Sequence, residues 1–347
     1  MFLPPIGSLW SVAFAVTMKK VLICVPTSNR VLKRFADNNV AVEFLKKPQA
    51  EDDDGVDVRW LEQHGDSVDY VLTNGQIGFP VEYLDFLPNL KLMGSNGVGY
   101  DGIDTAEIVS KRRILVSHTP NVVDAETSTT AILLYLACYR NFRSCENHAR
   151  TGAWGVGSPH PLTHTADQRT VGILGLGRIG TAIAEKLLPF GCNIVYHSRK
   201  PKSNVPYTYY SDLVQMAREV DCLVCVVPGG AATQHLVDDA VLDALGPDGV
   251  LINVSRGTVV DERALIRALQ EKRLGWAGLD VFENEPDIPA DLQLLENTVL
   301  LPHVGTATVE TRANMENLVA DNILQHVKDS TVLTAIPECN ELLRVES

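Results

Sequence analysis

A glycine-rich segment carries the clearest residue pattern for chemistry in this chain. Gly175–Gly180 reads GLGRIG, follows the apolar strand TVGIL directly, and opens the helical stretch TAIAEKLLPF. In a G-x-G-x-x-G turn the first glycine permits a tight bend, the second lets a pyrophosphate approach the backbone, and the third lets helix and strand pack closely. The phosphate then faces a helix N-terminus. The pattern predicts dinucleotide binding by Gly175, Leu176, Gly177, Arg178, Ile179 and Gly180.

The end of the next strand bears on which dinucleotide binds. NAD sites usually place Asp or Glu about 20 residues after the glycine motif, where it accepts hydrogen bonds from the ribose. Here the strand ends Tyr196-His197-Ser198-Arg199-Lys200, without an acid. A hydroxyl and two cations suit a 2′-phosphate. Ser198, Arg199 and Lys200 therefore favour NADP, and the alternative is NAD beside a solvated basic loop.

Three further patterns place charged residues where apolar strands end. They read Asn253-Val254-Ser255-Arg256-Gly257, Gly278-Leu279-Asp280-Val281-Phe282-Glu283-Asn284-Glu285-Pro286 and Leu301-Pro302-His303-Val304-Gly305. Doubly wound sheets carry their chemistry at the carboxyl ends of their strands. We therefore expect Arg256, these carboxylates and His303 to lie along one such edge.

The elements that must position these residues alternate between strands and helices, which predicts βαβ units on parallel sheets. A first series contains VLICVP, YVLTN, LKLMGSN and RILVSH, with helical candidates VEYLDFL and GIDTAEIVSKR. A long apolar helix is expected at 124–143, before a loop rich in Gly, Pro and His. A second series contains TVGILGLG, NIVYHS, CLVCVVP, VLINVS, WAGLDV and TVLLPH, and a helix at 309–328 with an irregular tail completes the chain. The simplest architecture is two α/β domains with a cleft between them.

Composition narrows the choice of partners. The 347 residues are sufficient for two domains, and 30 basic against 43 acidic residues give a net charge of -13. Such a charge disfavours nucleic acid and anionic membrane surfaces. Cys222 and Cys225 lie three apart in an apparent strand and point to opposite faces, and free thiols fit a reducing compartment. His160 and His164 flank Pro161, so we expect no metal site.

The N-terminal residues 1–17 form an uncharged segment whose apolar run is too short to span a bilayer. No Lys or Arg precedes that run, as a signal peptide would require. An upstream start before Met18 or a disordered extension is favoured over a functional signal. We therefore expect a cytoplasmic protein.

Together these motifs resemble the D-isomer-specific 2-hydroxyacid dehydrogenase family, which includes glyoxylate and hydroxypyruvate reductases. GLGRIG, NVSRG, LDVFENEP and LPHVG stand in the family's order and spacing, over a match from about Val21 to Ile336. The resemblance implies two Rossmann-like or flavodoxin-like doubly wound domains, with an active-site cleft between them. The substrate domain would comprise 18–119 and 304–347, the dinucleotide-binding domain 120–303, and the two connections a hinge. It also implies a homodimer, supported by the apolar helix near 130–136, with Trp154 beside the partner's site.

The resemblance also assigns roles in an NADP-dependent reduction of a small 2-keto acid. Such a reaction needs a hydride donor, a cation that orients the substrate and an acid that protonates the new alkoxide. His303 would be the acid, Glu285 would orient its imidazole, and Arg256 would bind the substrate. The N–H groups of Val98 and Gly99, in a segment that resembles the family's carboxylate loop (94–101), would receive the carboxylate, with Asn74 or Gln76 nearby. Further cofactor contacts are expected from Thr127, Val227, Pro228, Thr233, Val254, Asp280 and Gly305, and side-chain pocket contacts from Ile77, Phe79 and Tyr100.

Two departures from the family pattern leave alternatives open. Asp101-Gly102-Ile103-Asp104 replaces the usual Asn-Ile-Asp run, and Gly229-Gly230-Ala231-Ala232 replaces Leu-Thr-Pro-Glu beside the nicotinamide. One alternative is a dehydrogenase-like corepressor that senses the nucleotide. Others are an NAD-linked enzyme for a bulkier 2-keto acid, and a 3-phosphoglycerate or formate dehydrogenase. The missing acid at Ser198 and the leucine at Leu301 disfavour the last two.

Overall fold

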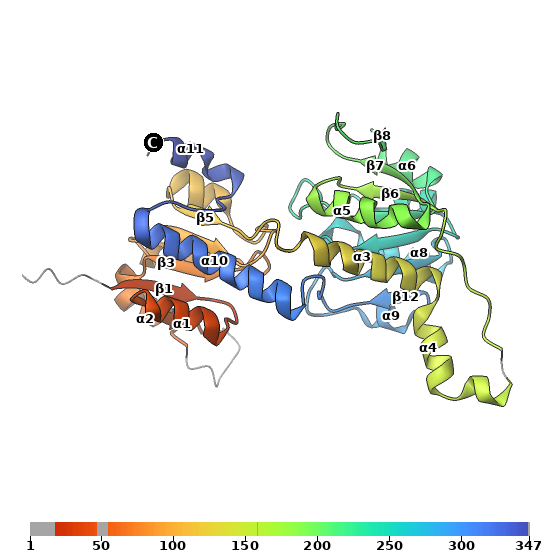
Figure 1. Cartoon of the computed structure of the whole chain (residues 1–347), viewed down its shortest axis with the longest axis horizontal. Coiled ribbons are helices and arrows are strands. Elements are labelled where there is room, and N and C mark those ends of the chain that lie inside the picture. Colours follow the sequence, from red (N-terminus) through yellow and green to blue (C-terminus); the bar gives the residue numbers. More distant parts are fainter. Residues whose placement is uncertain (1–17, 47–54, 158, 346–347) are drawn as a thin grey trace, which may run out of the picture.

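The computed structural model describes residues 18–46, 55–157 and 159–345, so the expectation for residues 1–17 lies outside the described part. Two α/β lobes lie side by side along the longest axis, and the chain crosses between them twice (Figure 1). The first lobe contains both the early strands and the C-terminal helices, and the second contains the middle of the chain. Within the described residues no helix is long and apolar enough to cross a membrane.

The first lobe is built on a five-stranded parallel sheet with the order β2-β1-β3-β4-β5, as in flavodoxin-like folds. Its strands are β1 (Lys19–Ile23), β2 (Val40–Phe44), β3 (Tyr70–Thr73), β4 (Leu92–Ser95) and β5 (Leu115–Ser117). Its helices are α1 (Asn29–Asp37), α2 (Val58–His64), α10 (Val309–Asp329) and α11 (Asn340–Val345), with a 3-10 helix at Val81–Phe86 and a π-helix at Ala106–Lys111. Its apolar core combines residues from 21–116 with residues from 319–342. The lobe therefore needs both ends of the chain.

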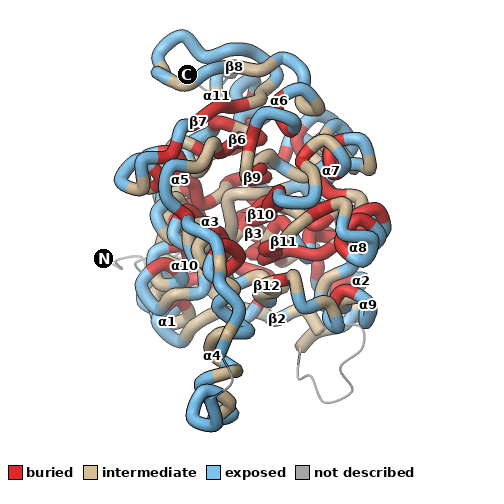
Figure 2. The backbone as a smooth tube through the Cα atoms, turned by 90° about the vertical axis from the view of Figure 1, so that its right-hand side faces the viewer, coloured by how far each residue is buried: buried red, intermediate tan, exposed pale blue. Residues whose placement is uncertain are grey.

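The second lobe is a seven-stranded parallel sheet with the order β12-β11-β10-β9-β6-β7-β8, the Rossmann order with one added edge strand. Its strands are β6 (Thr170–Leu174), β7 (Asn193–His197), β8 (Thr208–Tyr210), β9 (Cys222–Cys225), β10 (Val250–Asn253), β11 (Trp276–Leu279) and β12 (Thr298–Leu300). Its helices are α3 (Asp124–Tyr139), α4 (Phe142–Arg150), α5 (Arg178–Leu187), α6 (Leu213–Glu219), α7 (Asp239–Leu245), α8 (Glu262–Gln270) and α9 (Ala290–Leu294). Figure 2 shows the buried strands enclosed by helices whose outer faces are exposed. The expected fold class, two doubly wound parallel-sheet domains, is confirmed.

Two expected elements were wrong in detail. The long helix expected at 124–143 ends at Tyr139, because Asn141 adopts a left-handed backbone with φ of 43° and redirects the chain into α4. No residue of α4 is buried, so nothing holds it in line with α3. The tail expected to be irregular forms α11, since Cys339 and Leu342 pack into the core of the first lobe. The strands β2 and β8 were not anticipated.

Candidate active site

Loops from both sheets meet where the parallel strands end. The second sheet contributes the cofactor loop (Gly175–Gly180) after β6, the Arg256 segment after β10, Asp280 after β11 and His303 after β12. The first sheet contributes Asn74–Gly78 after β3 and the β4 loop (Asn96–Asp101). The Gln76–Glu285 hydrogen bond and the Asp101–Arg256 ion pair join the loops of the two sheets, so the site lies between the lobes.

The cofactor loop has the geometry that a pyrophosphate requires. Gly175 has φ of +102°, and a Cβ on Gly180 would lie 2.2 Å from the Gly175 carbonyl oxygen, so neither position accepts a side chain. Gly177 is the N-cap of α5 without a side-chain cap, and nothing lies within 4 Å of a Cβ built there. The backbone at Gly177 is thus open on its Cβ side, and the helix that begins there has no side-chain cap, which suits an anion.

The other residues of this loop have distinct surroundings. Leu176 is buried in the apolar core and Ile179 packs against it, so both contribute mainly through their backbones. Arg178 pairs with Asp124 at the start of α3, with 3.1 Å between Nε and Oδ2. The other Asp124 carboxylate oxygen is buried without a hydrogen-bond partner. The loop is therefore fixed to α3 by an ion pair that sequence reasoning did not anticipate.

Ser198, Arg199 and Lys200 lie just beyond the end of β7, on the strand next to β6 in the sheet. The Ser198 hydroxyl donates to the Lys200 carbonyl oxygen at 2.7 Å, which folds the segment into a turn. Arg199 and Lys200 are exposed, and neither forms a salt bridge within the described part of the chain. Two cations are therefore available to an anionic ligand at this edge, whereas the Ser198 hydroxyl hydrogen is already donated within the turn.

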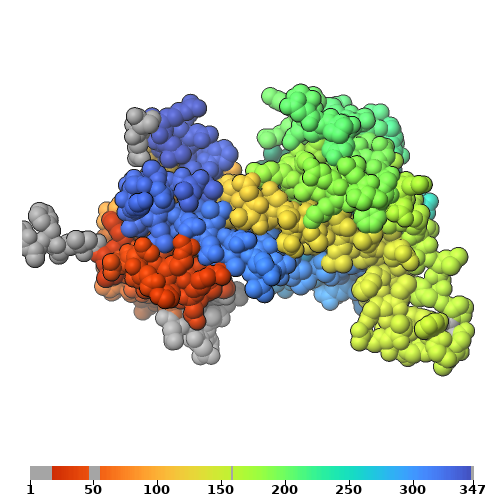
Figure 3. All heavy atoms as spheres, viewed as in Figure 1, coloured from red at the N-terminus to blue at the C-terminus, as the bar shows by residue number. Residues whose placement is uncertain are grey.

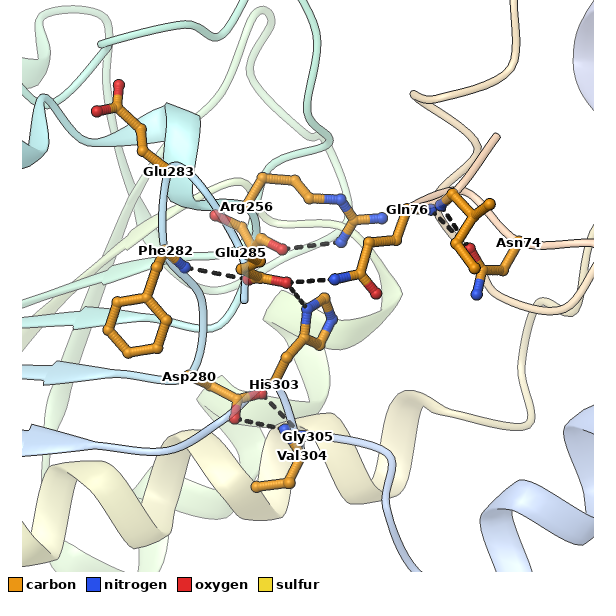
Figure 4. A network of polar contacts seen from close by, with 12 residues as sticks. Asn74, Gln76, Arg256, Asp280, Phe282, Glu283, Glu285, His303, Val304 and Gly305 are labelled. Atoms are coloured by element: carbon orange, nitrogen blue, oxygen red, sulfur yellow. Dashed lines mark hydrogen bonds and ion pairs between the residues drawn. The ribbon is translucent and has the colours of Figure 1, made fainter. Parts of the chain in front are cut away.

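His303 and Glu285 form the central pair of the site. Nδ1 of His303 lies 2.7 Å from Glu285 Oε2, and the Phe282 N–H donates to Glu285 Oε1 at 3.0 Å. Gln76, from the other lobe, donates its Nε2 to Glu285 Oε2 at 2.6 Å (Figure 4). The carboxylate thus has partners on both oxygens, and the bond to Nδ1 leaves Nε2 as the imidazole nitrogen available for proton transfer.

The charge of Glu285 follows from these contacts. Burial raises the pKa of the Glu285 carboxyl, but the hydrogen bond and charge of His303, the Phe282 N–H and the charge of Arg256 outweigh it. The net pKa is lowered, so Glu285 is an anion near neutral pH. The carboxylate accepts a hydrogen bond from Nδ1 and so fixes the orientation of the His303 imidazole.

Asp280 fixes the turn that carries His303. Its side chain is 2% exposed, and its oxygens accept the N–H groups of Val304 at 2.7 Å and Gly305 at 2.8 Å (Figure 4). Its own backbone carbonyl accepts the His303 N–H at 2.8 Å. Burial raises the pKa of Asp280, although these N–H groups oppose the shift. His303 has φ of 54°, a strained backbone that this set of bonds maintains.

Arg256 already contacts a carboxylate of the protein, Asp101 in the β4 loop. Its Nε lies 3.1 Å from each Asp101 oxygen and its Nη2 lies 3.0 Å from Oδ1, while Nη1 donates to the Ser255 carbonyl at 2.9 Å. Both side chains are about a quarter exposed. A Cβ on Gly99 would lie 1.9 Å from Nη2, so the guanidinium lies directly against the β4 loop.

The predicted substrate residues of the first lobe surround this pair. Asn74 Oδ1 accepts the N–H groups of Gln76 at 3.0 Å and Ile77 at 2.7 Å, a turn that directs Gln76 toward Glu285 (Figure 4). Val98 and Gly99 are partly exposed in the β4 loop. Gly99 approaches Gly75 so closely that a Cβ on Gly75 would lie 2.0 Å from its carbonyl oxygen. The two loops therefore act as one packed unit.

The remaining predicted residues fall into two groups. Of those predicted to contact the cofactor, Val227, Pro228 and Thr233 follow β9, Val254 follows β10, Gly305 follows β12, and Thr127 lies within α3. Of the three expected pocket residues, Ile77 is 54% exposed, whereas Phe79 is 4% exposed and packs on Tyr83. The Tyr100 hydroxyl donates to Glu338 at 3.1 Å, so its tip contacts the C-terminal segment. Burial and Glu338 raise the pKa of Tyr100 to about 12.

Apart from the Arg178–Asp124 pair, sequence reasoning missed three contacts at the site. They are the Asp101–Arg256 pair, the Gln76–Glu285 bond and the contact of His118 with the β4 loop, in which His118 Nδ1 lies 3.0 Å from the Val98 carbonyl oxygen. Each joins residues far apart in sequence. The only local signal was the acid of Asp101 beside a glycine-rich turn, which does not identify its partner.

Comparisons with known proteins agree with this geometry. Residues 132–305 match the family model of the D-isomer specific 2-hydroxyacid dehydrogenase, NAD binding domain. Over 80% of the chain and 88% of each relative, it is 45% identical to glyoxylate/hydroxypyruvate reductase A of Arabidopsis thaliana and 44% identical to hydroxyphenylpyruvate reductase of Plectranthus scutellarioides. The structure is similar to that of the NADPH-dependent glyoxylate/hydroxypyruvate reductase of Sinorhizobium meliloti in complex with NADP and malonate. The TM-score is 0.85 at 39% identity, covering 93% of this chain and 98% of the other.

Proposed function

Because the chain belongs to the D-isomer-specific 2-hydroxyacid dehydrogenase family, we propose that it reduces glyoxylate or hydroxypyruvate with NADPH. The observation that carries this proposal is the His303–Glu285 pair beside Arg256 and the β4 loop. A proton donor, a cation and backbone N–H groups around one space are what a 2-keto acid requires. Glyoxylate and hydroxypyruvate are two of the 2-keto acids that reductases of this family act on, as the names of its relatives indicate.

The proposed proton transfer uses the imidazole of His303. When bound, the reduced nicotinamide supplies a hydride to the carbonyl carbon of the substrate. His303 Nε2 donates a proton to the carbonyl oxygen, so the C=O bond becomes a CH–OH group. The substrate gains a hydride and a proton, and its net charge is unchanged. Glu285 holds the ring so that Nε2 faces the substrate. In the reverse direction the same nitrogen accepts the proton.

Substrate binding is proposed to use Arg256 together with the N–H groups of Val98 and Gly99. Asp101 occupies the Nε side of the guanidinium, and its carboxylate holds the planar group in one orientation. The remaining Nη hydrogens are then free to reach the carboxylate and carbonyl oxygens of a keto acid. Asn74 and Gln76 support this wall of the site from the other loop.

The cofactor preference is proposed from two parts of the second lobe. The open backbone at Gly177 and the uncapped start of α5 fit a pyrophosphate. Ser198, Arg199 and Lys200 supply positive charge and a hydroxyl where an NAD site would have an acid. We propose that they contact the 2′-phosphate of NADP, with NAD as a weaker substrate. Val254 and Asp280 would lie beside the nicotinamide, with Asp280 acting mainly by holding the His303 turn.

The two lobes are proposed to be the substrate domain, 18–119 with 304–347, and the dinucleotide-binding domain, 120–303. Two chain segments connect them among the described residues, and the Gln76–Glu285 and Asp101–Arg256 pairs join them at the site. Two connections between rigid lobes make a hinge, whose closure would exclude water before hydride transfer.

Absorbance of the reduced nicotinamide tests the proposal. Oxidation of NADPH and NADH is followed with glyoxylate, hydroxypyruvate, pyruvate, phenylglyoxylate and 4-hydroxyphenylpyruvate. We expect the highest kcat/KM with NADPH and one of the first two acids. A preference for the aromatic acids, as the name of the Plectranthus relative suggests for that protein, would replace the proposed substrate. Tight nucleotide binding without any turnover would favour the corepressor-like alternative.

A homodimer is proposed from the arm formed by α4 and residues 151–157, which projects from the second lobe (Figure 3). It exposes Phe142 at 61%, Trp154 at 77% and Val156 at 84%. We propose that a second copy covers these side chains and that Trp154 reaches the partner's site. Light scattering measures the mass in solution, and a monomer at assay concentration would contradict this.

A cytoplasmic location is proposed from the acidic net charge and the seven free cysteines.

A further inference from the structure

Two consecutive hydrogen bonds join the β4 loop to the segment that follows β5. The Thr119 N–H donates to the Gly97 carbonyl at 2.9 Å, and His118 Nδ1 lies 3.0 Å from the Val98 carbonyl oxygen. Because a carbonyl oxygen only accepts, Nδ1 carries the proton in this contact. The bonds extend the pairing of β4 with β5 beyond its last paired residues, Gly94 and Ser117.

The two carbonyls belong to the peptide units whose N–H groups are those of Val98 and Gly99. Both peptides are trans, so in each the C=O and N–H point in opposite directions within one plane. Donors on the carbonyl side therefore direct both N–H groups away from the β5 segment. A hydrogen-bonded carbonyl also polarises its peptide and makes the N–H a stronger donor.

His118 is itself firmly held. Its N–H donates to the Thr334 carbonyl at 3.1 Å, and its own carbonyl accepts the Thr334 hydroxyl at 2.6 Å. The Tyr100 ring meets the imidazole edge-on, with 5.6 Å between ring centroids, while its hydroxyl bonds to Glu338. The C-terminal segment thus holds the His118 backbone through Thr334 and the Tyr100 ring against its imidazole through Glu338.

We propose that His118 is a positioning residue for the substrate carboxylate, because it orients and polarises the Val98–Gly99 peptide. The inference rests on the proposed function, in which the Val98 and Gly99 N–H groups receive that carboxylate. His118 contacts no reacting atom and acts only through this peptide. It sets the affinity for any 2-keto acid, since the carboxylate is common to the class.

The charged and titratable groups that face His118 are Tyr100 and Glu338 in the first lobe and Arg178 in the cofactor loop. Burial lowers the pKa of His118 below its usual value, and Arg178 lowers it further, against the effects of the Val98 carbonyl and Glu338. The imidazole is therefore neutral near pH 7 and acts as a hydrogen-bond donor. Asparagine, whose amide can donate from a similar position, is the conservative replacement.

The test compares His118→Leu, which removes the donor, with His118→Asn, which retains one. For the keto acid that the unchanged enzyme reduces best, His118→Leu should raise KM about tenfold, as expected for losing an orienting hydrogen bond. The kcat should change by less than about twofold, because carboxylate binding is uniform between ground and transition states. His118→Asn should restore most of the affinity. His64→Leu, which removes an exposed imidazole from α2 of the same lobe, is the matched control and should leave KM within about twofold.

Calorimetric binding of glyoxylate to the protein loaded with NADP⁺ separates this inference from the proposed function, since that complex cannot turn over. His118→Leu should weaken this binding about tenfold and leave binding of NADPH unchanged. Equal affinities for the unchanged protein and His118→Leu would overturn the role of His118, as would failure of His118→Asn to restore binding. If His118→Leu does not fold, His118→Gln, whose amide is displaced by one methylene, takes its place with the same expectations.

Discussion

The cofactor loop after β6 and the β4 loop both follow a buried parallel strand, yet they achieve their conformations differently. The cofactor loop is fixed by its own glycines, because Gly175 requires a positive φ and Gly180 contacts the Gly175 carbonyl. The β4 loop is fixed by residues from elsewhere: His118 and Thr119 on its carbonyls, and Arg256 against Gly99. The backbone of the cofactor loop thus depends mainly on its own sequence, with the Arg178–Asp124 pair joining it to α3, whereas that of the β4 loop depends on tertiary contacts. Substitutions should therefore affect them in different ways.

The largest effect is expected at His303, whose turn is held by hydrogen bonds to Asp280. His303→Ala should lower kcat by roughly two to four orders of magnitude if the imidazole donates the proton. Steady-state rates with NADPH measure this, and NADPH binding by fluorescence should be unchanged. Near-normal turnover would refute the role, and His326→Ala, at a buried histidine outside the site, is a control for the loss of an imidazole.

The next effect concerns cofactor choice, which should depend on the second lobe alone. Ser198→Asp combined with Arg199→Ala introduces the missing acid and removes a phosphate partner. The ratio of kcat/KM for NADPH over NADH should fall by about tenfold or more, while the KM for the keto acid stays nearly constant. An unchanged ratio would show that other residues read the 2′-phosphate. Lys202→Ala, at an exposed neighbouring cation, shows whether net charge alone has an effect.

A matched pair of glycine substitutions compares the loops directly. A methyl group on Gly177 meets nothing within 4 Å, so Gly177→Ala should fold normally and weaken only NADPH binding, by about tenfold. A methyl group on Gly99 would meet Arg256 Nη2, so Gly99→Ala should displace the guanidinium and raise the KM for the keto acid by about tenfold. Calorimetry with each ligand checks the split. Similar losses of both ligands in both variants would show that the loops are not independent.

The smallest expected effect is on the free energy of unfolding and concerns Glu285, which bonds to Gln76 of the other lobe. Its pKa is lowered in the folded protein, so its ionised form stabilises the fold above the unfolded-state pKa of about 4.3. This contribution should disappear as pH falls through the lower folded-state pKa. Denaturant unfolding of the unchanged protein and Glu285→Gln should therefore differ by about 1 kcal/mol near pH 7 and converge in acid. A difference that grows on acidification would contradict the assigned shift.

The comparison between loops also explains what the sequence could predict. The alternation of strands and helices, the glycine turn and the strand-end positions of Arg256, Asp280 and His303 are local or periodic signals, and each lies at the end of a strand as expected. The Asp101–Arg256 pair, the Gln76–Glu285 bond and the contact of His118 with Val98 depend on segments brought together only by folding. No pattern within one segment could reveal them.

The same limit applies to the elements that were wrong. The periodicity of 124–143 continues past Tyr139, but the left-handed backbone of Asn141 turns the chain into α4, which buries none of its residues fully. The tail looked irregular because α11 is short. Its stability comes from burying Cys339 and Leu342 in a core formed mainly by residues more than 200 positions earlier.

The composition of the first lobe's core has a consequence for co-translational folding. The strands of the first lobe are synthesised first, yet their core is completed only by residues 319–342. The second lobe contains all of its strands and core within one continuous stretch and can fold as soon as that stretch has emerged. The first strands must therefore remain without part of their core until residues 319–342 have been synthesised. We expect the middle of the nascent chain to fold before its beginning.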